Sequence, residues 1–187
     1  MSDRIPGPRQ RLLNTAITMV QERGVHATGL SDLLKRSSAA RNSIYQHFPG
    51  GKEELMVAVT DTAGAITAAR IDRLAAVNDP ARVVTGMIDR WVSEMEASGF
   101  NTGCPIAAAA LAGPEEPSIT SAAARAFELL RGRISASLIG AGHDAQEAAQ
   151  LASFSVSAIE GALLQARAQR SAQPLRDAEA VLVRILG

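Results

Sequence analysis

The chain has 187 residues, of which 47% are apolar and only 3% aromatic, and this length suits one compact domain or a small module joined to a larger one. A single cysteine, Cys104, excludes a disulfide within one chain, and no stretch approaches the ~20 apolar residues that a membrane span needs, so we expect a cytoplasmic protein that does not enter membranes. Alanine outnumbers the β-branched residues, and 19 basic side chains balance 19 acidic ones, a composition that favours helix over sheet.

Apolar residues spaced three and four apart predict three helices in the first 50 residues, over 8–22, 30–36 and 40–46. Pro8 suits a first helical turn, Gly24 ends the first helix, and Thr28 is placed to cap the second. The pair Ser37-Ser38 interrupts the pattern, and Phe48-Pro49-Gly50-Gly51 ends it. Eight basic side chains against five acidic ones among the first 60 residues fit a nucleic-acid-binding segment, although ordinary surface variation also produces such a balance.

Six more helices are predicted in the remainder of the chain, over 52–76, 80–98, 104–112, 117–139, 144–170 and 174–186. Asp79 and Pro80 mark a helix start, and Gly113-Pro114 marks a helix end. The helix over 144–170 is apolar on more than one side and carries small residues near Gly161, so we expect other helices to cover both of its sides. The predicted fold class is therefore all-α, with about nine helices.

Two short helices joined by a tight turn and packed on a longer first helix make a helix-turn-helix, whose second helix enters the major groove of DNA. Arg41 can bond guanine with its forked guanidinium, Asn42 can bond the edge of adenine, and Lys52 stands at a helix start that favours a phosphate. Ile44 and Phe48 are expected to face the core of this unit. Side chains that can donate to phosphate oxygens are Ser43, Tyr45 and His47.

Tyr45 and His47 each have a second interpretation. Tyr45 could be a core aromatic, but Ile44 and Phe48 already face inward, so we favour the DNA-facing role. His47 could be a helix cap or a surface residue as well as a phosphate donor, and both interpretations stay open.

The run Ser43-Ile44-Tyr45-Gln46-His47-Phe48, followed by Gly51-Lys52-Glu53-Glu54-Leu55, resembles the DNA-binding signature of the TetR/AcrR-type transcriptional regulators. Gly103-Cys104-Pro105-Ile106 and Ile159-Glu160-Gly161-Ala162-Leu163 resemble the LmrA-like branch of that family. The resemblance implies a helix-turn-helix DNA-binding head over 1–50 and a helical ligand-binding and dimerisation body over 51–187. The DNA contacts that it implies are Thr28, Arg41, Asn42, Ser43, Tyr45, Gln46, His47 and Lys52.

The sequence departs from the family pattern at three positions of the head. Gly is usual where Ser38 stands, and Ser, Thr or Pro is usual where Ala40 stands, so the groove-facing helix lacks its customary cap. A missing cap costs about 1 kcal/mol, and we expect the first two departures to loosen the head until DNA orders it. Gly is common where Asn42 stands, which predicts an operator unlike those of relatives that carry Gly.

Family bodies enclose a pocket, so the resemblance implies a small-molecule effector site among the helices from Met87 to Phe127, although plain core packing explains the same residues. The candidate ligand-binding residues are Met87, Trp91, Met95, Cys104, Phe127, Leu130 and Phe154. The last two long helices are expected to pair with their symmetry mates in a homodimer. The candidate dimer residues are Phe154, Ala158, Gly161, Ala162, Val181 and Ile185.

Two polar or reactive side chains of the body have unsettled roles. Cys104 could be a redox sensor, but a lone cysteine beside Pro and Ile is more often a small buried hydrophobe, which we favour. Glu160 lies in an apolar, small-residue stretch, where it could meet a polar ligand or pair with an arginine across the dimer.

The sequence contains no Gly-x-Ser-x-Gly, no phosphate-binding glycine loop and no paired histidine ligands, so we expect no enzyme. His26, His47 and His143 are far apart and no cysteine or carboxylate cluster joins them, so no metal or cofactor is expected. The sequence thus predicts a repressor that a small, apolar molecule releases from palindromic operator DNA. A ligand-independent dimeric regulator and a helical adaptor that has lost DNA binding are the alternatives.

Overall fold

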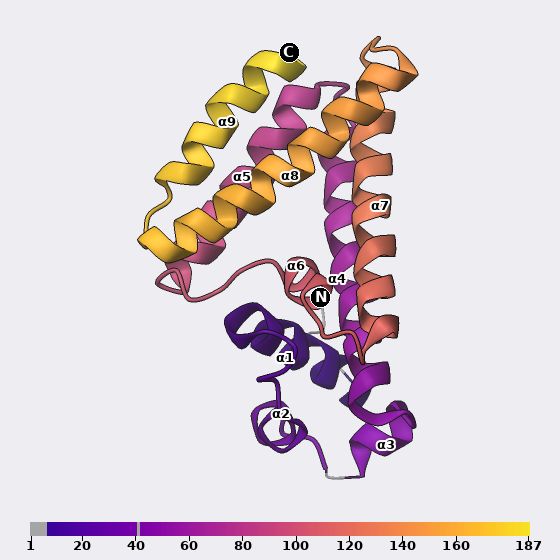
Figure 1. Ribbon diagram of the computed structural model, residues 1–187. Coiled ribbons are helices and arrows are strands. Elements are labelled where there is room, and N and C mark those ends of the chain that lie inside the picture. The colour runs from indigo at the N-terminus through magenta and orange to yellow at the C-terminus, as the bar shows by residue number, and fades with distance from the viewer. Residues whose placement is uncertain (1–6, 41) are drawn as a thin grey trace, which may run out of the picture. The chain divides into compact units, whose positions relative to one another are not determined.

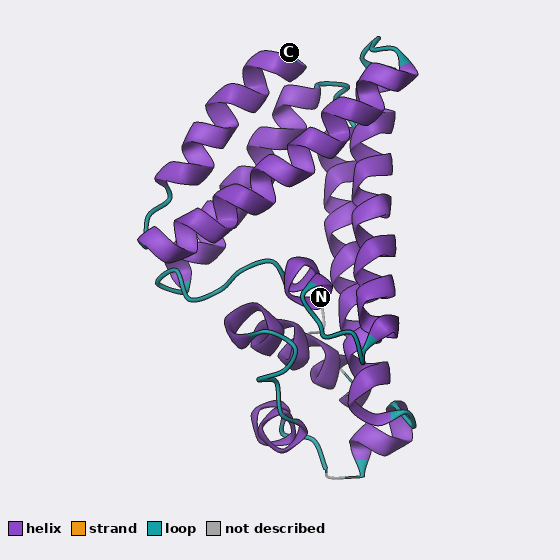
Figure 2. Cartoon of the chain, in the orientation of Figure 1, coloured by secondary structure: helices purple, strands orange, loops and turns teal. Residues whose placement is uncertain are grey.

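The computed structural model describes residues 7–40 and 42–187, and within them it contains nine α-helices and no strand (Figures 1 and 2). The predicted all-α fold class is confirmed. The helices are α1 (Pro8–Arg23), α2 (Leu30–Ser37), α3 (Ser43–His47), α4 (Gly51–Ala75), α5 (Pro80–Ala97), α6 (Pro105–Ala110), α7 (Pro117–Gly140), α8 (Ala145–Gln169) and α9 (Gln173–Leu186). None of these described helices combines the length and the apolar character needed to cross a membrane.

Tertiary contacts divide the chain into two compact units. The first unit joins Met1–Ala63 to Pro105–Ala124, and the second joins Gly64–Cys104 to Arg125–Gly187. The boundary falls inside α4 and α7, so each of these helices has residues in both units. The packing units therefore differ from the predicted division at residue 50, because α6 and the first turns of α4 and α7 pack with the N-terminal helices. The functional division at residue 50 stays a prediction.

The core of the first unit is built on α1, which contacts α2, α3 and α6. Its buried side chains form one apolar stripe: Leu12, Leu13, Ala16, Met19 and Val20. Ile17, which the sequence pattern also placed on this face, is only half-buried. Leu33 of α2, Ile44 of α3 and Ile106 of α6 are each at most 1% exposed, so each of these helices that contact α1 buries an apolar side chain.

Local bonds set where the helices of the first unit begin and end. Pro8 occupies the first turn of α1 as predicted, and Gly24 ends the helix at φ +80°, a conformation that glycine adopts without a Cβ clash. The prediction that Thr28 caps α2 is wrong, because Gly29 is the N-cap and no side chain accepts a bond there. The helix α3 begins at Ser43 and not at residue 40, so it is shorter than predicted.

In the second unit, α9 packs against α5 and α8, and α5 also contacts α8 (Figure 1). The predicted helix start at Asp79 is confirmed, because its carboxylate accepts a hydrogen bond from Arg82 N at 3.0 Å. Asp144 caps α8 in the same way through Gln146 N and Glu147 N. Ile66 of α4 is 52% exposed.

Candidate DNA interface

The short helix α3 has one buried face and one exposed face. Ile44 and Phe48 are each 1% exposed, which confirms that they face the core. Contacts between α3 and α1 hold this face in place. Tyr45 is 62% exposed, which contradicts the core-aromatic interpretation, and Gln46 is exposed beside it. A helix that is anchored on one side and bare on the other has the geometry that readout in a major groove requires.

The turn between α2 and α3 starts with a residue in an unfavourable backbone conformation. Ser38 has φ 51° and ψ 37°, the left-handed region that residues with a Cβ rarely adopt. A hydrogen bond from Ala39 N to Leu34 O, 3.2 Å long, stabilises the end of α2 at this turn. Glycine adopts this conformation freely, so the departure from glycine at position 38 has a direct structural cost.

No side chain caps the start of α3. Asn42 is the N-cap residue, but its backbone is helical, with φ −74° and ψ −13°, and its amide makes no capping bond. Ser43 N instead donates to Ala40 O at 2.8 Å, so a turn replaces the first turn of the predicted helix. Ala40 has no oxygen with which to cap, in agreement with the expected loss of a cap. Asn42 is exposed, and Arg41, a predicted DNA contact, lies outside the described residues.

Three predicted DNA contacts have less exposed surface than the sequence suggested. Thr28 is fully buried, and its hydroxyl donates to Gly24 O at 2.7 Å. This bond holds the loop between α1 and α2 together and argues against a DNA contact, because a buried side chain cannot reach a phosphate. Ser43 is only 7% exposed, and His47 is half-buried, so both interpretations of His47 stay open.

Lys52 and Glu54 share the start of α4. Lys52 is half-buried, and its Nζ donates to the carbonyl oxygen of His26 at 3.1 Å. An ammonium has three donors, so a phosphate contact remains compatible with this bond. Glu54 Oε2 accepts from Gly50 N at 2.6 Å and already places a negative charge at the helix start. A phosphate would therefore meet the Lys52 side chain and not a bare helix end.

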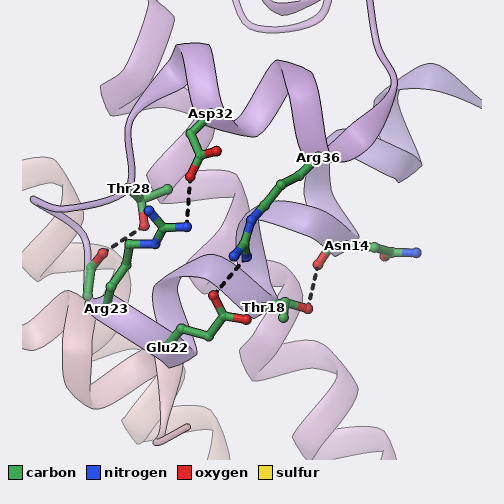
Figure 3. A network of polar contacts seen from close by, with 8 residues as sticks. Asn14, Thr18, Glu22, Arg23, Thr28, Asp32 and Arg36 are labelled. Carbon is green, nitrogen blue, oxygen red and sulfur yellow. Dashed lines mark hydrogen bonds and ion pairs between the residues drawn. The ribbon is translucent and has the colours of Figure 1, made fainter. Parts of the chain in front are cut away.

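Two arginines of the first unit form ion pairs that join α1 to α2 (Figure 3). Arg23 Nη2 lies 2.8 Å from Asp32 Oδ2, and Arg36 Nη1 lies 2.7 Å from Glu22 Oε2. The four side chains are 32–44% exposed, so each pair contributes at most about 1 kcal/mol to stability. Both arginines add to the basic balance of the segment, but a carboxylate neutralises each of them locally.

One further cation, which no sequence pattern indicates, lies beside α3. Arg9 Cζ lies 5.3 Å from the centroid of the Phe48 ring, a cation–π distance. Arg9 is exposed whereas Phe48 is buried, so the guanidinium covers the ring at the surface of the first unit. The two residues are far apart in sequence and lie on different elements, so no local pattern could have paired them.

The predicted ligand-binding residues all belong to the second unit. Four of them are at most 8% exposed: Met87, Met95, Cys104 and Leu130. Trp91 and Phe127 are half-buried, and Phe154 is 53% exposed. A packed core and a closed pocket both produce these exposures, so an effector site at these residues stays a prediction.

A groove of about 440 Å³ runs between α8 and α9, with mostly small and apolar side chains along it. It is lined by Phe154, Ser157, Ala158, Gly161, Ala162, Gln165, Pro174, Asp177, Ala178, Val181 and Leu182. All the predicted dimer residues except Ile185 are among them, and Ile185 is 40% exposed. A Cβ added at Gly161 would meet nothing within 4 Å, so the packing of the single chain does not require glycine there.

Glu160 of α8 hydrogen-bonds with the thiol of Cys104. Burial raises the pKa of the Glu160 carboxyl, and the bond with Cys104 offsets part of that rise. Cys104 is 8% exposed. Reactive cysteines need an electropositive setting, and a carboxyl neighbour is the opposite, which favours the interpretation of Cys104 as a buried hydrophobe.

Comparisons with known proteins match both the N-terminal and the C-terminal part of the chain to transcriptional regulators. Residues 12–59 match the family described as bacterial regulatory proteins, tetR family, and residues 80–181 match the transcriptional regulator LmrA/YxaF-like, C-terminal domain. An HTH-type transcriptional regulator of Mycobacterium tuberculosis is 36% identical over 90% of this chain and 89% of its own. The HTH-type transcriptional regulator YxaF of Bacillus subtilis is 29% identical over 89% of this chain and 88% of its own.

A solved structure has the same fold over nearly the whole chain. The crystal structure of a TetR transcriptional regulator from Legionella pneumophila matches with a TM-score of 0.85 at 24% identity. The match covers 97% of this chain and 98% of the other. The likeness at this identity concerns the fold.

Proposed function

The chain belongs to the TetR family of bacterial transcriptional regulators, in its LmrA/YxaF-like branch, and from this membership we propose that it is a homodimeric repressor which a small, apolar effector releases from a palindromic operator. The family establishes a DNA-binding regulator that is not an enzyme; the dimer, the effector and the palindrome are the proposal. The proposal rests on one observation: α3 and the two residues that flank it bury Ile44 and Phe48 and expose Asn42, Tyr45 and Gln46. We expect the protein to act in the cytoplasm, where the chromosome lies.

The exposed side chains of α3 have the chemistry to read DNA. The Asn42 side-chain NH2 can donate to adenine N7 while its carbonyl oxygen accepts from the adenine N6 amino group, and Gln46 can make the same bidentate pair. The Tyr45 hydroxyl and the Lys52 ammonium can donate to phosphates on either side of the groove. We therefore propose that Asn42 and Gln46 recognise the base sequence, and that Tyr45 and Lys52 bind the DNA phosphates and fix the position of the protein along the duplex.

The groove between α8 and α9 supports the proposed homodimer. Phe154, Leu164, Val181 and Ile185 are large apolar side chains that are 40–65% exposed in the single chain. A glycine inside a helix costs about 1 kcal/mol relative to alanine. A Cβ at Gly161 would meet nothing within the single chain, so close packing of a second chain against this position would explain why glycine is present. A two-fold axis through this surface would present two copies of α3 to a palindromic operator.

Release by an effector needs two states of the dimer that bind DNA unequally. A small molecule shifts their populations only by its differential affinity for the two. We place the site for an apolar molecule among the buried apolar residues of the second unit, which include Met87, Met95 and Leu130. The helix α4 runs from Lys52, beside the DNA-binding helices, into the second unit, and its covalent continuity makes it our proposed link between effector and head.

The proposal is tested by fluorescence anisotropy with two labelled duplexes, one from the DNA directly upstream of the protein's own reading frame and one scrambled. Asn42→Ala should weaken binding to the upstream duplex by at least about 30-fold, because each chain of the dimer loses one bidentate base contact, and leave the scrambled duplex unaffected. The control is Gln150→Ala, which alters an exposed amide of α8.

Two outcomes would contradict the proposal. Equal loss on both duplexes would mean that Asn42 does not read sequence. No salt-dependent binding of the unaltered protein to either duplex would favour the helical adaptor, in which the conformation of Ser38 and the shortened α3 have cost the head its DNA binding.

A further inference from the structure

We propose that Arg9 is a phosphate-binding residue of the DNA interface, held in position by the ring of Phe48, so that the interface extends from α3 to the first turn of α1. The inference rests on the proposed DNA-binding function and adds a contact that neither the motif nor the sequence spacing indicates. It starts from the 5.3 Å separation between Arg9 Cζ and the Phe48 ring centroid.

The cation–π contact fixes where the guanidinium lies. Phe48 directly follows α3, and a helix of five residues is only about 7.5 Å long. The guanidinium is therefore held beside the residue that ends α3. Because Phe48 is buried and Arg9 is exposed, the charge sits at the surface of the first unit.

Stacking leaves the hydrogen-bonding edges of the guanidinium available. A guanidinium meets an aromatic ring with its flat face, while its five N–H donors point outward in its own plane. Phosphate oxygens accept bonds from such an edge in pairs. Phe48 can therefore orient Arg9 without using any of the donors that a phosphate needs.

Three other cations of the first unit already have partners. Arg23 and Arg36 are paired with Asp32 and Glu22, and Lys52 donates to the carbonyl oxygen of His26. Among the described residues, Arg9 forms no ion pair with a carboxylate. Within the described part of the first unit no carboxylate neutralises its charge, which can therefore bind a polyanion.

The helix that carries Arg9 adds to the positive potential. The first turn of α1 holds no acidic residue, and its N-cap, Gly7, supplies no side-chain acceptor. In contrast, α2 has Asp32 in its first turn, and α4 has Glu53 and Glu54. Acidic side chains of the first turn thus offset the partial positive charge of the helix N-terminus in α2 and α4, whereas the first turn of α1 holds none.

The test is anisotropy with the upstream and scrambled duplexes at several salt concentrations. Arg9→Ala should lower the affinity for both duplexes roughly 100-fold, because each of the two chains of a dimer loses a charged hydrogen bond that contributes roughly tenfold. A dimer loses two phosphate contacts, so the slope of log K against log salt should become less steep by about 2. The control is Arg73→Ala, which removes an exposed charge of α4 in the second unit and should change the affinity less than twofold.

The role of the ring is tested separately. Phe48→Leu should weaken binding in the unaltered protein and have no further effect in Arg9→Ala. Arg9→Lys, which keeps the charge but not the flat stacked face, should keep the salt slope and lose part of the affinity. This variant alters an exposed residue and remains informative where Phe48→Leu destabilises the protein.

Three outcomes would overturn the inference. Arg9→Ala could behave like Arg73→Ala, which would remove Arg9 from the interface. Arg9→Lys could bind as tightly as the unaltered protein, or Phe48→Leu could weaken binding equally in both backgrounds, and either result would show that the ring does not position the cation. If the unaltered protein binds neither duplex, both the proposed function and this inference fail. If the unaltered protein binds DNA and Arg9→Ala binds it equally well, only this inference fails.

Discussion

Lys52 Nζ donates a hydrogen bond to the carbonyl oxygen of His26 at 3.1 Å, which joins the start of α4 to the loop between α1 and α2. The side chain of His26 also lies close to the residue that precedes α7, with Nδ1 3.5 Å from Glu116 Oε2. That carboxylate oxygen is buried and has no hydrogen-bond partner among the described residues. One loop residue thus contacts the starts of two long helices within the first unit, and a shift of α4 would reach the helix-turn-helix through it.

Lys52→Ala should therefore lower both stability and DNA affinity. The lost bond to His26 should reduce the free energy of unfolding by about 1 kcal/mol, measured by thermal melting. The lost phosphate contact should flatten the salt dependence of binding by about 2 per dimer. A lower melting temperature with an unchanged salt slope would give Lys52 a structural role alone.

Ser38→Gly should stabilise the protein, because the left-handed backbone at this position suits glycine. We expect a gain of about 1 kcal/mol, which raises the melting temperature of a chain of this size by about 2–4 °C. Ala39→Gly is the matched control, because Ala39 lacks a positive φ and should lose stability instead. A gain at both positions, or at neither, would show that strain at Ser38 is not the cause.

Gly161→Ala should stabilise each chain by up to about 1 kcal/mol, because the added Cβ meets nothing and alanine favours helix. Gly161→Leu should place a large side chain in the groove between α8 and α9 and shift the dimer towards monomer, as measured by analytical ultracentrifugation. Gly132 of α7 is the control, because a Cβ there also meets nothing within 4 Å and the residue does not line the groove. An equal effect of Gly132→Leu, or a monomeric unaltered protein, would remove this surface from the proposed dimer.

Glu160→Gln should stabilise the protein in a pH-dependent way. Burial raises the pKa of Glu160 in the folded state, so its protonated form is favoured there. Below the unfolded pKa, about 4.3, both states are protonated and the substitution changes little. Above that pH the unfolded state loses its proton first, so the unaltered protein loses stability as pH rises towards the folded pKa. Chemical unfolding at pH 4 and pH 8 checks this, and a gain that is equal at the two pH values would contradict it.

Trp91→Ala should spare DNA binding and impair release by an effector, because Trp91 is half-buried in the second unit beside apolar residues. The measurement is anisotropy of the bound duplex during a screen of small apolar compounds, with Trp91→Phe as the variant that keeps an aromatic ring. Trp91 is the single tryptophan, so its fluorescence reports compounds that bind close to it. A variant that unfolds or no longer binds DNA would assign Trp91 to core packing.

Much of the architecture could be predicted from the sequence, because it depends on local signals. The starts at Pro8 and Asp79 lie where proline and capping chemistry placed them, since a cap involves residues only a few positions apart. The inward direction of Ile44 and Phe48 followed from the helical period in the same way. The local failures were Thr28, whose hydroxyl bonds back to Gly24 and does not cap α2, and α3, which starts late because Ala40 supplies no cap.

What the sequence by itself determined was an all-α regulator of the TetR family with a helix-turn-helix signature that includes Asn42, since periodicity and a contiguous motif are properties of neighbouring residues. Only the tertiary structure decided which charges are used internally: Arg23 and Arg36 in ion pairs, Lys52 on the His26 carbonyl, and Arg9 over the Phe48 ring. Such pairings depend on how helices distant in sequence pack against each other, and a charged side chain has the same local pattern whether its partner is a carboxylate, a ring or a phosphate.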